Sequence, residues 1–182
     1  GNLLEDLYED TSERMVGDID FLVSPSDYTN AIAILKEHHY QKVLITKHDY
    51  PKSQFKHYPR LYSSDKIAAV EIHKEMLVEK YADEFNYGRV FKNIQKINGF
   101  YVLDYSDQLC LSILAKQIND NGQYFKDVAL RNAYDVFLLS KKCNTQQSIS
   151  RFKKLFDPLN NFLAISNEVF NDISSLRIIS SD

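Results

Sequence analysis

A chain of 182 residues with 44% hydrophobic side chains can bury a substantial core, and we expect one domain or one domain with a helical appendage. The formal net charge is -3, which gives no reason to expect strong, non-specific attraction to nucleic acid. No apolar stretch approaches the roughly 20 residues that cross a bilayer, and the amino terminus has neither a basic nor an apolar signal region, so we expect a soluble, cytoplasmic protein.

The first elements along the chain alternate between helix and strand. Apolar side chains share one face of residues 2–8, which predicts a short amphipathic helix, and a brief β-prone run follows at residues 19–23. Ser24-Pro25-Ser26 ends that run, and Ser26 or Asp27 can cap the next helix. We expect this helix over about residues 28–38, with the inward side chains Ala31, Ile32, Ile34 and Leu35.

Three further strands are expected before residue 75. Residues 41–46 have strand character, and so do residues 55–62 and 67–73. The small polar residues Ser63-Ser64-Asp65, between the last two segments, suit a hairpin loop. We therefore expect these two strands to pair antiparallel.

The character of the chain changes from Asn98-Gly99 onward. A last short strand at residues 101–103 is followed by helical periodicity, first from about 106 to 119 with Ser106-Asp107 as its cap, then from 127 to 141 and on to about 175. The predicted fold class is α+β. Residues 1–103 would form a small mixed sheet with flanking helices, and residues 104–182 a carboxyl-terminal helical bundle.

The two cysteines, Cys110 and Cys143, lack the spacing of metal ligands. Cys110 lies in an apolar run, where we expect a buried, reduced thiol. This cysteine usage fits a reducing compartment.

Three acidic residues form a candidate metal site. Asp18 and Asp20 flank one residue of the strand predicted at 19–23, so the strand period of two sends both carboxylates to one face while Ile19 points into the core. Such close carboxylates repel each other unless a cation neutralises them, and hard oxygen ligands favour Mg²⁺ or Mn²⁺. Glu71 is the obvious third donor, because it shares a face with His73 in the alternating segment Val70-Glu71-Ile72-His73. Phosphoryl-type transfer uses ions that are held in this way.

An Asp-x-Asp pattern also occurs by chance, most often at a solvated strand end or turn. The order of elements favours the metal site, since a strand with two acids is followed by a helix and then by a hairpin that supplies a third acid. The chance interpretation predicts that the carboxylates of Asp18, Asp20 and Glu71 lie farther apart than the ~4–6 Å over which such charges couple directly.

Three blocks of sequence, in this order, resemble the uncharacterised bacterial nucleotidyltransferase family of the DNA polymerase beta superfamily. They are Arg14-Met15-Val16-Gly17-Asp18-Ile19-Asp20-Phe21-Leu22-Val23, His57-Tyr58-Pro59-Arg60-Leu61 and Val70-Glu71-Ile72-His73. The resemblance covers roughly residues 1–75. Farther along, Arg131-Asn132-Ala133-Tyr134-Asp135 is similar to the family's helical Arg/Asp segment.

The resemblance implies roles for the acidic and histidine side chains. Asp18 and Asp20 would bind the metal and the triphosphate, and Glu71 would complete the ion site and act as a base. For His73, a catalytic or substrate contact and a hydrogen-bonded structural role are equal alternatives. For His57 the structural role is favoured over a substrate contact.

The resemblance also implies phosphate contacts. Arg14 either contacts the triphosphate through two hydrogen bonds from its guanidinium group or is an exposed loop arginine. Lys116 matches a basic position that some relatives turn towards the cleft. The superfamily normally has a strand that ends in a Gly-rich turn, whose backbone N–H groups hold the nucleotide phosphates. The sequence begins where that turn is expected. Gly1-Asn2 is either the remnant of this motif or, at Gly1, a residue left by a cleaved tag. In both cases we expect the nucleotidyltransferase core to lack its first strand.

These features lead to one main hypothesis and one alternative. The main hypothesis is an enzyme that uses Mg²⁺ or Mn²⁺ to move a nucleoside monophosphate from an NTP to an acceptor hydroxyl, with release of pyrophosphate. The lack of a basic stripe favours a small-molecule or protein acceptor over nucleic acid, and no membrane partner is expected. The alternative is a catalytically inactive module of the same fold that senses nucleotides or binds a protein.

Overall fold

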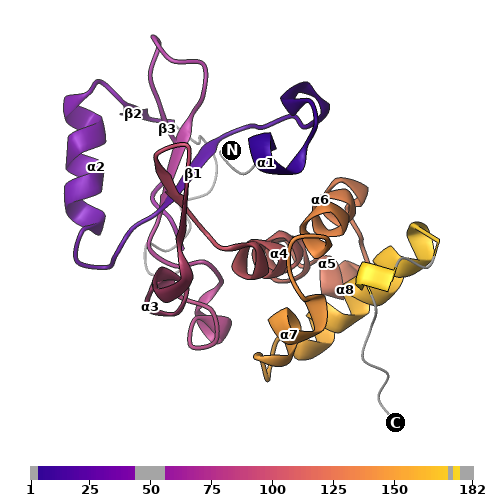
Figure 1. Cartoon of the computed structure of the whole chain (residues 1–182). Coiled ribbons are helices and arrows are strands. Elements are labelled where there is room, and N and C mark those ends of the chain that lie inside the picture. Colours follow the sequence, from indigo (N-terminus) through magenta and orange to yellow (C-terminus); the bar gives the residue numbers. More distant parts are fainter. Residues whose placement is uncertain (1–3, 44–55, 172–173, 177–182) are drawn as a thin grey trace. The chain divides into compact units, whose positions relative to one another are not determined.

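The computed structural model describes residues 4–43, 56–171 and 174–176, and its fold class is α+β, as the sequence predicts (Figure 1). The chain forms two compact units. The first spans Ser12–Arg89, and the second holds the chain up to Thr11 and from Val90 onward.

This division differs from the boundary predicted between residues 103 and 104. The short amino-terminal helix α1 (Leu4–Leu7) packs on α6 (Leu130–Ser140), and the Tyr8 hydroxyl donates a hydrogen bond of 2.5 Å to Asp135 Oδ1. The start of the chain therefore belongs to the helical unit, and so does the hairpin at residues 95–102.

The first unit is built on a four-stranded sheet in the order β1-β4-β3-β2. Its strands are β1 (Ile19–Leu22), β2 (Gln41–Lys42), β3 (Leu61–Tyr62) and β4 (Val70–His73). β1 runs parallel to β4, whereas β3 pairs antiparallel with both β4 and β2.

The antiparallel pairing predicted for residues 55–62 and 67–73 is confirmed over the described residues. Beyond β3, the Tyr58 N–H donates to the Ile72 carbonyl at 2.8 Å, and His57 forms a bridge with His73. The ladder therefore extends along the full length of β4. Of the strand predicted at 41–46, the structure shows β2, and residues 44–46 lie outside the described residues.

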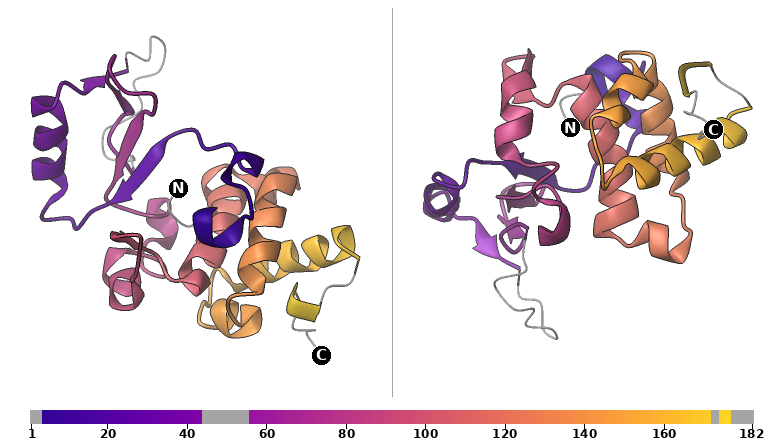
Figure 2. Two further views of the ribbon diagram at one scale, coloured as in Figure 1. Left: turned by 45° about the horizontal axis from the view of Figure 1, so that its top comes forward. Right: turned by 90° about the horizontal axis from the view of Figure 1, so that it is seen from below.

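Helix α2 (Tyr28–Glu37) covers one face of this sheet and lies beside it in every view (Figure 1; Figure 2). Ile32 packs against Leu61, Val70 and Ile72, and partly buried side chains surround this cluster: Val23, Tyr28, Ala31, Leu35, Tyr40 and Tyr58. Because side chains alternate along a strand, Glu71 and His73 of β4 face the side away from α2.

Two sequence-based expectations for this core are wrong. Ile19 points to the same sheet face as Val70 but is 45% exposed and not part of the core, because β1 lies at the sheet edge and α2 packs over β4. Ile34 is 46% exposed, since it lies off the helical stripe that Ala31, Ile32 and Leu35 form. Asp27 does stand at the N-cap of α2, but its carboxylate accepts a hydrogen bond from Ser24 Oγ and makes no capping bond.

Short helical elements precede and follow the sheet along the chain. η1 (Thr11–Glu13) comes before β1, and η3 (Glu79–Tyr81), α3 (Tyr87–Val90) and η4 (Phe91–Asn93) follow β4. A hairpin of β5 (Gln95–Ile97) and β6 (Phe100–Val102) follows. Its turn residues Asn98 and Gly99 have φ values of 50° and 87°, the left-handed conformation that Asn-Gly adopts in two-residue hairpin turns. The second of these strands agrees with the strand predicted at residues 101–103, whereas the first was not predicted.

The helical part of the second unit is organised around α4 (Tyr105–Leu114), which packs on α6, α7 (Thr145–Ser150) and α8 (Phe156–Val169). A π-helical turn (Ala115–Asn119) extends α4, and α5 (Gly122–Phe125) and η6 (Ser174–Leu176) complete the unit. Among the residues that the structure describes, no helix is both long and apolar enough to span a membrane.

The polar start of α4 differs from the prediction. Asp104 is the cap, because its Oδ1 accepts a hydrogen bond of 2.7 Å from the Asp107 N–H. Asp107 is instead buried and pairs with Arg151 Nη2 at 2.5 Å. Arg151 also donates from Nε to the Ser148 carbonyl at 2.9 Å. Cys110 is buried and free, as expected, and burial raises the pKa of its thiol to about 12.

The Asp107–Arg151 pair provides a test of this packing. Arg151→Ala would remove the Arg151 counter-charge from the Asp107 carboxylate, whose side chain is 1% exposed. We expect the free energy of unfolding to fall by about 3 kcal/mol, the cost of breaking one partner out of a buried pair. Urea unfolding followed by circular dichroism measures the change. The exposed Arg131→Ala in α6 is the matched control, and equal stability of the two variants would contradict the prediction.

Candidate functional site

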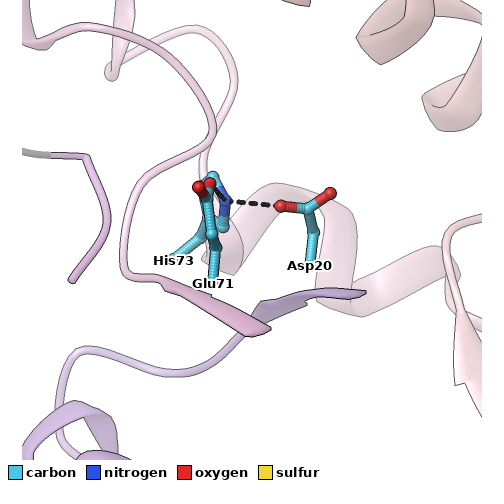
Figure 3. A group of neighbouring side chains, drawn as sticks. All are labelled: Asp20, Glu71 and His73. Atoms are coloured by element: carbon cyan, nitrogen blue, oxygen red, sulfur yellow. Dashed lines mark hydrogen bonds and ion pairs between the residues drawn. The ribbon is translucent and has the colours of Figure 1, made fainter. Parts of the chain in front are cut away.

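The parallel pairing of β1 with β4 brings the predicted acidic residues together. In this register Asp20 lies beside Glu71, and Leu22 lies beside His73. Partners on neighbouring parallel strands point to the same face, and that face is opposite the one covered by α2. Figure 3 shows the Asp20 side chain directed from β1 towards the Glu71 and His73 side chains of β4.

The three side chains are close enough to share one ion. His73 Nε2 lies 3.0 Å from Asp20 Oδ1 and 3.6 Å from Glu71 Oε2. One ligand atom from each residue falls within 4.8 Å of the others. Asp20 and Glu71 therefore lie together, and His73, for which the sequence left a catalytic or substrate contact and a structural role as equal alternatives, is the third member of the group.

His57 adds a second imidazole to the site. It lies opposite His73 across the β-bridge, and the two ring centroids are 4.8 Å apart. Its Nδ1 is 2.8 Å from the Tyr58 carbonyl oxygen, which can only accept, so Nδ1 carries a proton and donates it. Nε2 then faces the Glu71 carboxylate, 3.8 Å from Oε2.

Asp18 reaches the site through Arg60. The Arg60 guanidinium pairs with the Asp18 carboxylate through Nη2, and its Nε lies 3.6 Å from Glu71 Oε1. Of the predicted triad, Asp20 and Glu71 therefore share one cluster, whereas Asp18 is linked to Glu71 only through Arg60 and is not among the three residues whose ligand atoms lie within 4.8 Å of one another. Arg60 was not predicted as a site residue, although it lies in the block His57-Tyr58-Pro59-Arg60-Leu61. Its neighbour Leu61 pairs with Val70 on the core face, so alternation turns Arg60 to the opposite face.

The positive groups shift the ionisation of the acids. The hydrogen bond from His73 lowers the pKa of Glu71, burial opposes that effect, and the charges of His57 and Arg60 reinforce it. Burial disfavours the charged form of His73, but its hydrogen bonds to Asp20 and Glu71 outweigh that cost and raise its pKa. Without an ion, histidine and arginine provide the cations that the clustered carboxylates need.

The remaining predicted site residues lie elsewhere. Gly1 and Asn2 are outside the described residues. Arg14 Nη1 donates a hydrogen bond to the neighbouring Met15 carbonyl. Lys116 belongs to the second unit, where its Nζ pairs with Asp127 Oδ2 at 2.7 Å, so its predicted cleft contact stays a prediction. In the segment that resembles the family's helical Arg/Asp motif, Asp135 is nearly buried and accepts the bond from Tyr8.

The donor set is suited to a divalent cation. Two carboxylates supply hard oxygen ligands and His73 supplies a nitrogen, all on neighbouring β-strands that hold their backbones in register. Asp20 has a 65% exposed side chain, whereas Glu71 and His73 are 20% and 15% exposed, so the group opens to solvent on the Asp20 side. A solvated ion with a phosphate ligand can approach from there.

Comparison with known protein families matches residues 1–171 to one family, described as uncharacterised nucleotidyltransferase. The matched segment includes every element that forms the site. A search of curated proteins finds no match.

The opposed pKa shifts predict how stability depends on pH when no metal is present. Because the pKa of His73 is raised in the folded protein, protonated His73 stabilises the fold. This stabilisation is complete below the ordinary histidine pKa of 6.5 and is lost as the pH rises through the pKa of His73 in the folded state. Because the pKa of Glu71 is lowered in the folded protein, its ionised carboxylate stabilises the fold. This stabilisation is present above the ordinary glutamate pKa of 4.5 and is lost as the pH falls through the pKa of Glu71 in the folded state. We expect the melting temperature in EDTA to fall as the pH rises above 6.5.

His73→Gln should remove this component of the pH dependence, while His38→Gln, at the exposed end of α2, should retain it. Differential scanning fluorimetry between acidic and mildly alkaline pH measures both. An unchanged slope in His73→Gln would show that this histidine is not the titrating group.

Proposed function

Because the chain belongs to the uncharacterised nucleotidyltransferase family, we propose that it is a metal-dependent enzyme that moves a nucleoside monophosphate from an NTP to an acceptor hydroxyl. Pyrophosphate leaves as the acceptor oxygen attacks the α-phosphorus in line. The observation that carries this proposal is the register of β1 on β4, which sets Asp20 beside Glu71 on an open sheet face.

The three carboxylates have distinct surroundings and so suit distinct tasks. A divalent cation, when bound, neutralises phosphate oxygens and makes the attacking hydroxyl more acidic. Asp20 and Glu71 would hold it, with Asp18 as a further oxygen donor beside Arg60. Asp20 or Glu71 would also accept the proton of the acceptor hydroxyl, since both carboxylates belong to the solvent-facing cluster.

Arg60 is suited to contact the triphosphate. Its side chain is 48% exposed, so the guanidinium keeps donors available on the solvent side while it neutralises Asp18 and approaches Glu71. A planar guanidinium matches two phosphate oxygens at once. This role is additional to the one considered for Arg14.

The acceptor is proposed to be a small molecule or a protein. The formal net charge of -3 provides no general attraction for a polyanionic strand, which a nucleic-acid acceptor would require along many phosphates. Cytoplasmic NTP and Mg²⁺ or Mn²⁺ would be the other components of the reaction.

The carboxylates provide the main test of the enzyme. Asp20→Asn and Glu71→Gln keep the side-chain size but remove the charge, so each should lower kcat by about a hundredfold or more. Release of labelled pyrophosphate from NTP, with a cell extract as the source of acceptor, measures the reaction. Glu37→Gln, at the exposed end of α2, is the matched control. Transfer that persists in Asp20→Asn would exclude this mechanism, and NTP binding without any turnover would favour the inactive sensing module.

Arg60 should act mainly on substrate binding. We expect Arg60→Ala to raise KM for NTP about tenfold, the equivalent of one lost charge-assisted contact, with a smaller effect on kcat. Arg60→Lys should recover part of the loss, because it restores the charge but not the planar fork. Lys66→Ala, in the exposed hairpin turn, controls for the loss of one positive charge. A fall in kcat with an unchanged KM would contradict this assignment.

A further inference from the structure

We propose that His73 is itself a ligand of the cation, together with Asp20 and Glu71, and that its nitrogen makes the site prefer Mn²⁺ to Mg²⁺. This inference rests on the proposed function, since it concerns the ion that the reaction would use. It assigns to His73 a direct contact with the metal in place of a hydrogen bond at the edge of the site.

The distances between the donor atoms fit one coordination sphere. Around an octahedral ion with bonds of about 2.1 Å, adjacent ligand atoms lie about 3 Å apart and opposite ones about 4 Å apart. His73 Nε2 is 3.0 Å from Asp20 Oδ1 and 3.6 Å from Glu71 Oε2, which are values for adjacent ligands with little rearrangement. All three donor atoms lie within 4.8 Å of one another.

The position of His73 in the sheet holds its ring in this place. β4 is flanked by β1 on one side and by β3 on the other, and beyond β3 the residue His57 forms an isolated β-bridge with His73. The His73 side chain is 15% exposed and packs against the His57 ring, so it has little freedom to turn away. Asp20, in contrast, is 65% exposed and can adjust to the ion.

The neighbouring His57 is the second imidazole near the carboxylates, and its contacts differ from those of His73. Its Nδ1 proton is committed to the Tyr58 carbonyl, so its Nε2 faces the Glu71 carboxylate. His57 is not among the residues whose ligand atoms lie within 4.8 Å of one another, so the nitrogen ligand is assigned to His73 and not to His57.

The mixed donor set discriminates between cations. Mg²⁺ demands oxygen ligands in near-ideal octahedral geometry and gives up its water reluctantly. Imidazole is a borderline ligand that transition-metal ions accept more readily, and Mn²⁺ also suits the carboxylates. A site with carboxylate ligands alone has no such preference, so the nitrogen that His73 adds to the carboxylate oxygens is the feature that would favour Mn²⁺.

Metal binding to the whole protein without nucleotide tests this assignment. The electron paramagnetic resonance signal of free Mn²⁺ gives the Mn²⁺ affinity, and competition gives that of Mg²⁺. We expect His73→Gln to weaken Mn²⁺ binding by about tenfold or more while Mg²⁺ binding changes less. His73→Asp creates a third carboxylate and should lower the preference for Mn²⁺ over Mg²⁺ by a similar factor. His38→Gln, at the exposed end of α2, should match the wild type.

A spectroscopic measurement identifies the ligands of bound Mn²⁺ without relying on the binding affinities. Bound Mn²⁺ should show electron spin echo modulation from a coordinated ¹⁴N in the wild type and in His57→Gln, and this modulation should vanish in His73→Gln and His73→Asp. A wild-type ion without nitrogen modulation would overturn the proposal, and so would modulation that survives in both His73 variants or depends on His57 alone. If Mn²⁺ binds through His73 but no NTP is consumed, the proposed function fails while this assignment holds. Conversely, if nucleotide transfer occurs while the bound Mn²⁺ has only oxygen ligands, this assignment fails and the proposed function holds.

Discussion

The parallel pairing of β1 with β4 is the constraint on which the candidate site depends. Backbone hydrogen bonds fix Asp20 beside Glu71 and Leu22 beside His73, so the spacing of the functional groups follows from the ladder and not from flexible loops. A shift of one residue would turn the side chains of one strand to the opposite face. The Ile19 N–H to Ala69 carbonyl bond and the Val23 N–H to His73 carbonyl bond extend this register at both ends, at 2.9 and 3.0 Å.

The packing of α2 gives the sheet two different faces. Ile32 and its neighbours bury Val70 and Ile72, so Glu71 and His73 must face the other way. That second face gathers acidic groups whose mutual repulsion has to be offset. Arg60, His57 and His73 all lie within 4 Å of a carboxylate oxygen and supply the compensating charge and hydrogen bonds. In the proposed function, a cation would replace the histidine and arginine partners of the carboxylates, and phosphate oxygens would replace the carboxylate partners of Arg60.

The second unit uses its polar residues for structure. Asp107 and Arg151 join α4 to the end of α7, and the Tyr8 hydroxyl binds Asp135 of α6. Asp135 lies in a segment that resembles a family motif, and in this structure it anchors the start of the chain to the helices. A motif residue can thus be explained by packing, whereas the side chain of Asp20 is 65% exposed and that of Glu71, which is 20% exposed, interacts with charged and histidine side chains.

The amino-acid sequence was enough to predict the α+β class, several of the elements and the candidate acidic residues, because these predictions depend on local periodicity and on side-chain chemistry. The β-prone run at 19–23, the helix at 28–38 and the acids Asp18, Asp20 and Glu71 all required only neighbouring residues. Other features needed the tertiary structure. Only strand order could show that Ile19 lies on an edge strand and that Arg60 reaches Asp18, 42 residues away in the chain. Likewise, only the register of β1 on β4 could bring His73 beside Asp20, since contacts across a sheet depend on which strands become neighbours and not on the pattern within any one of them.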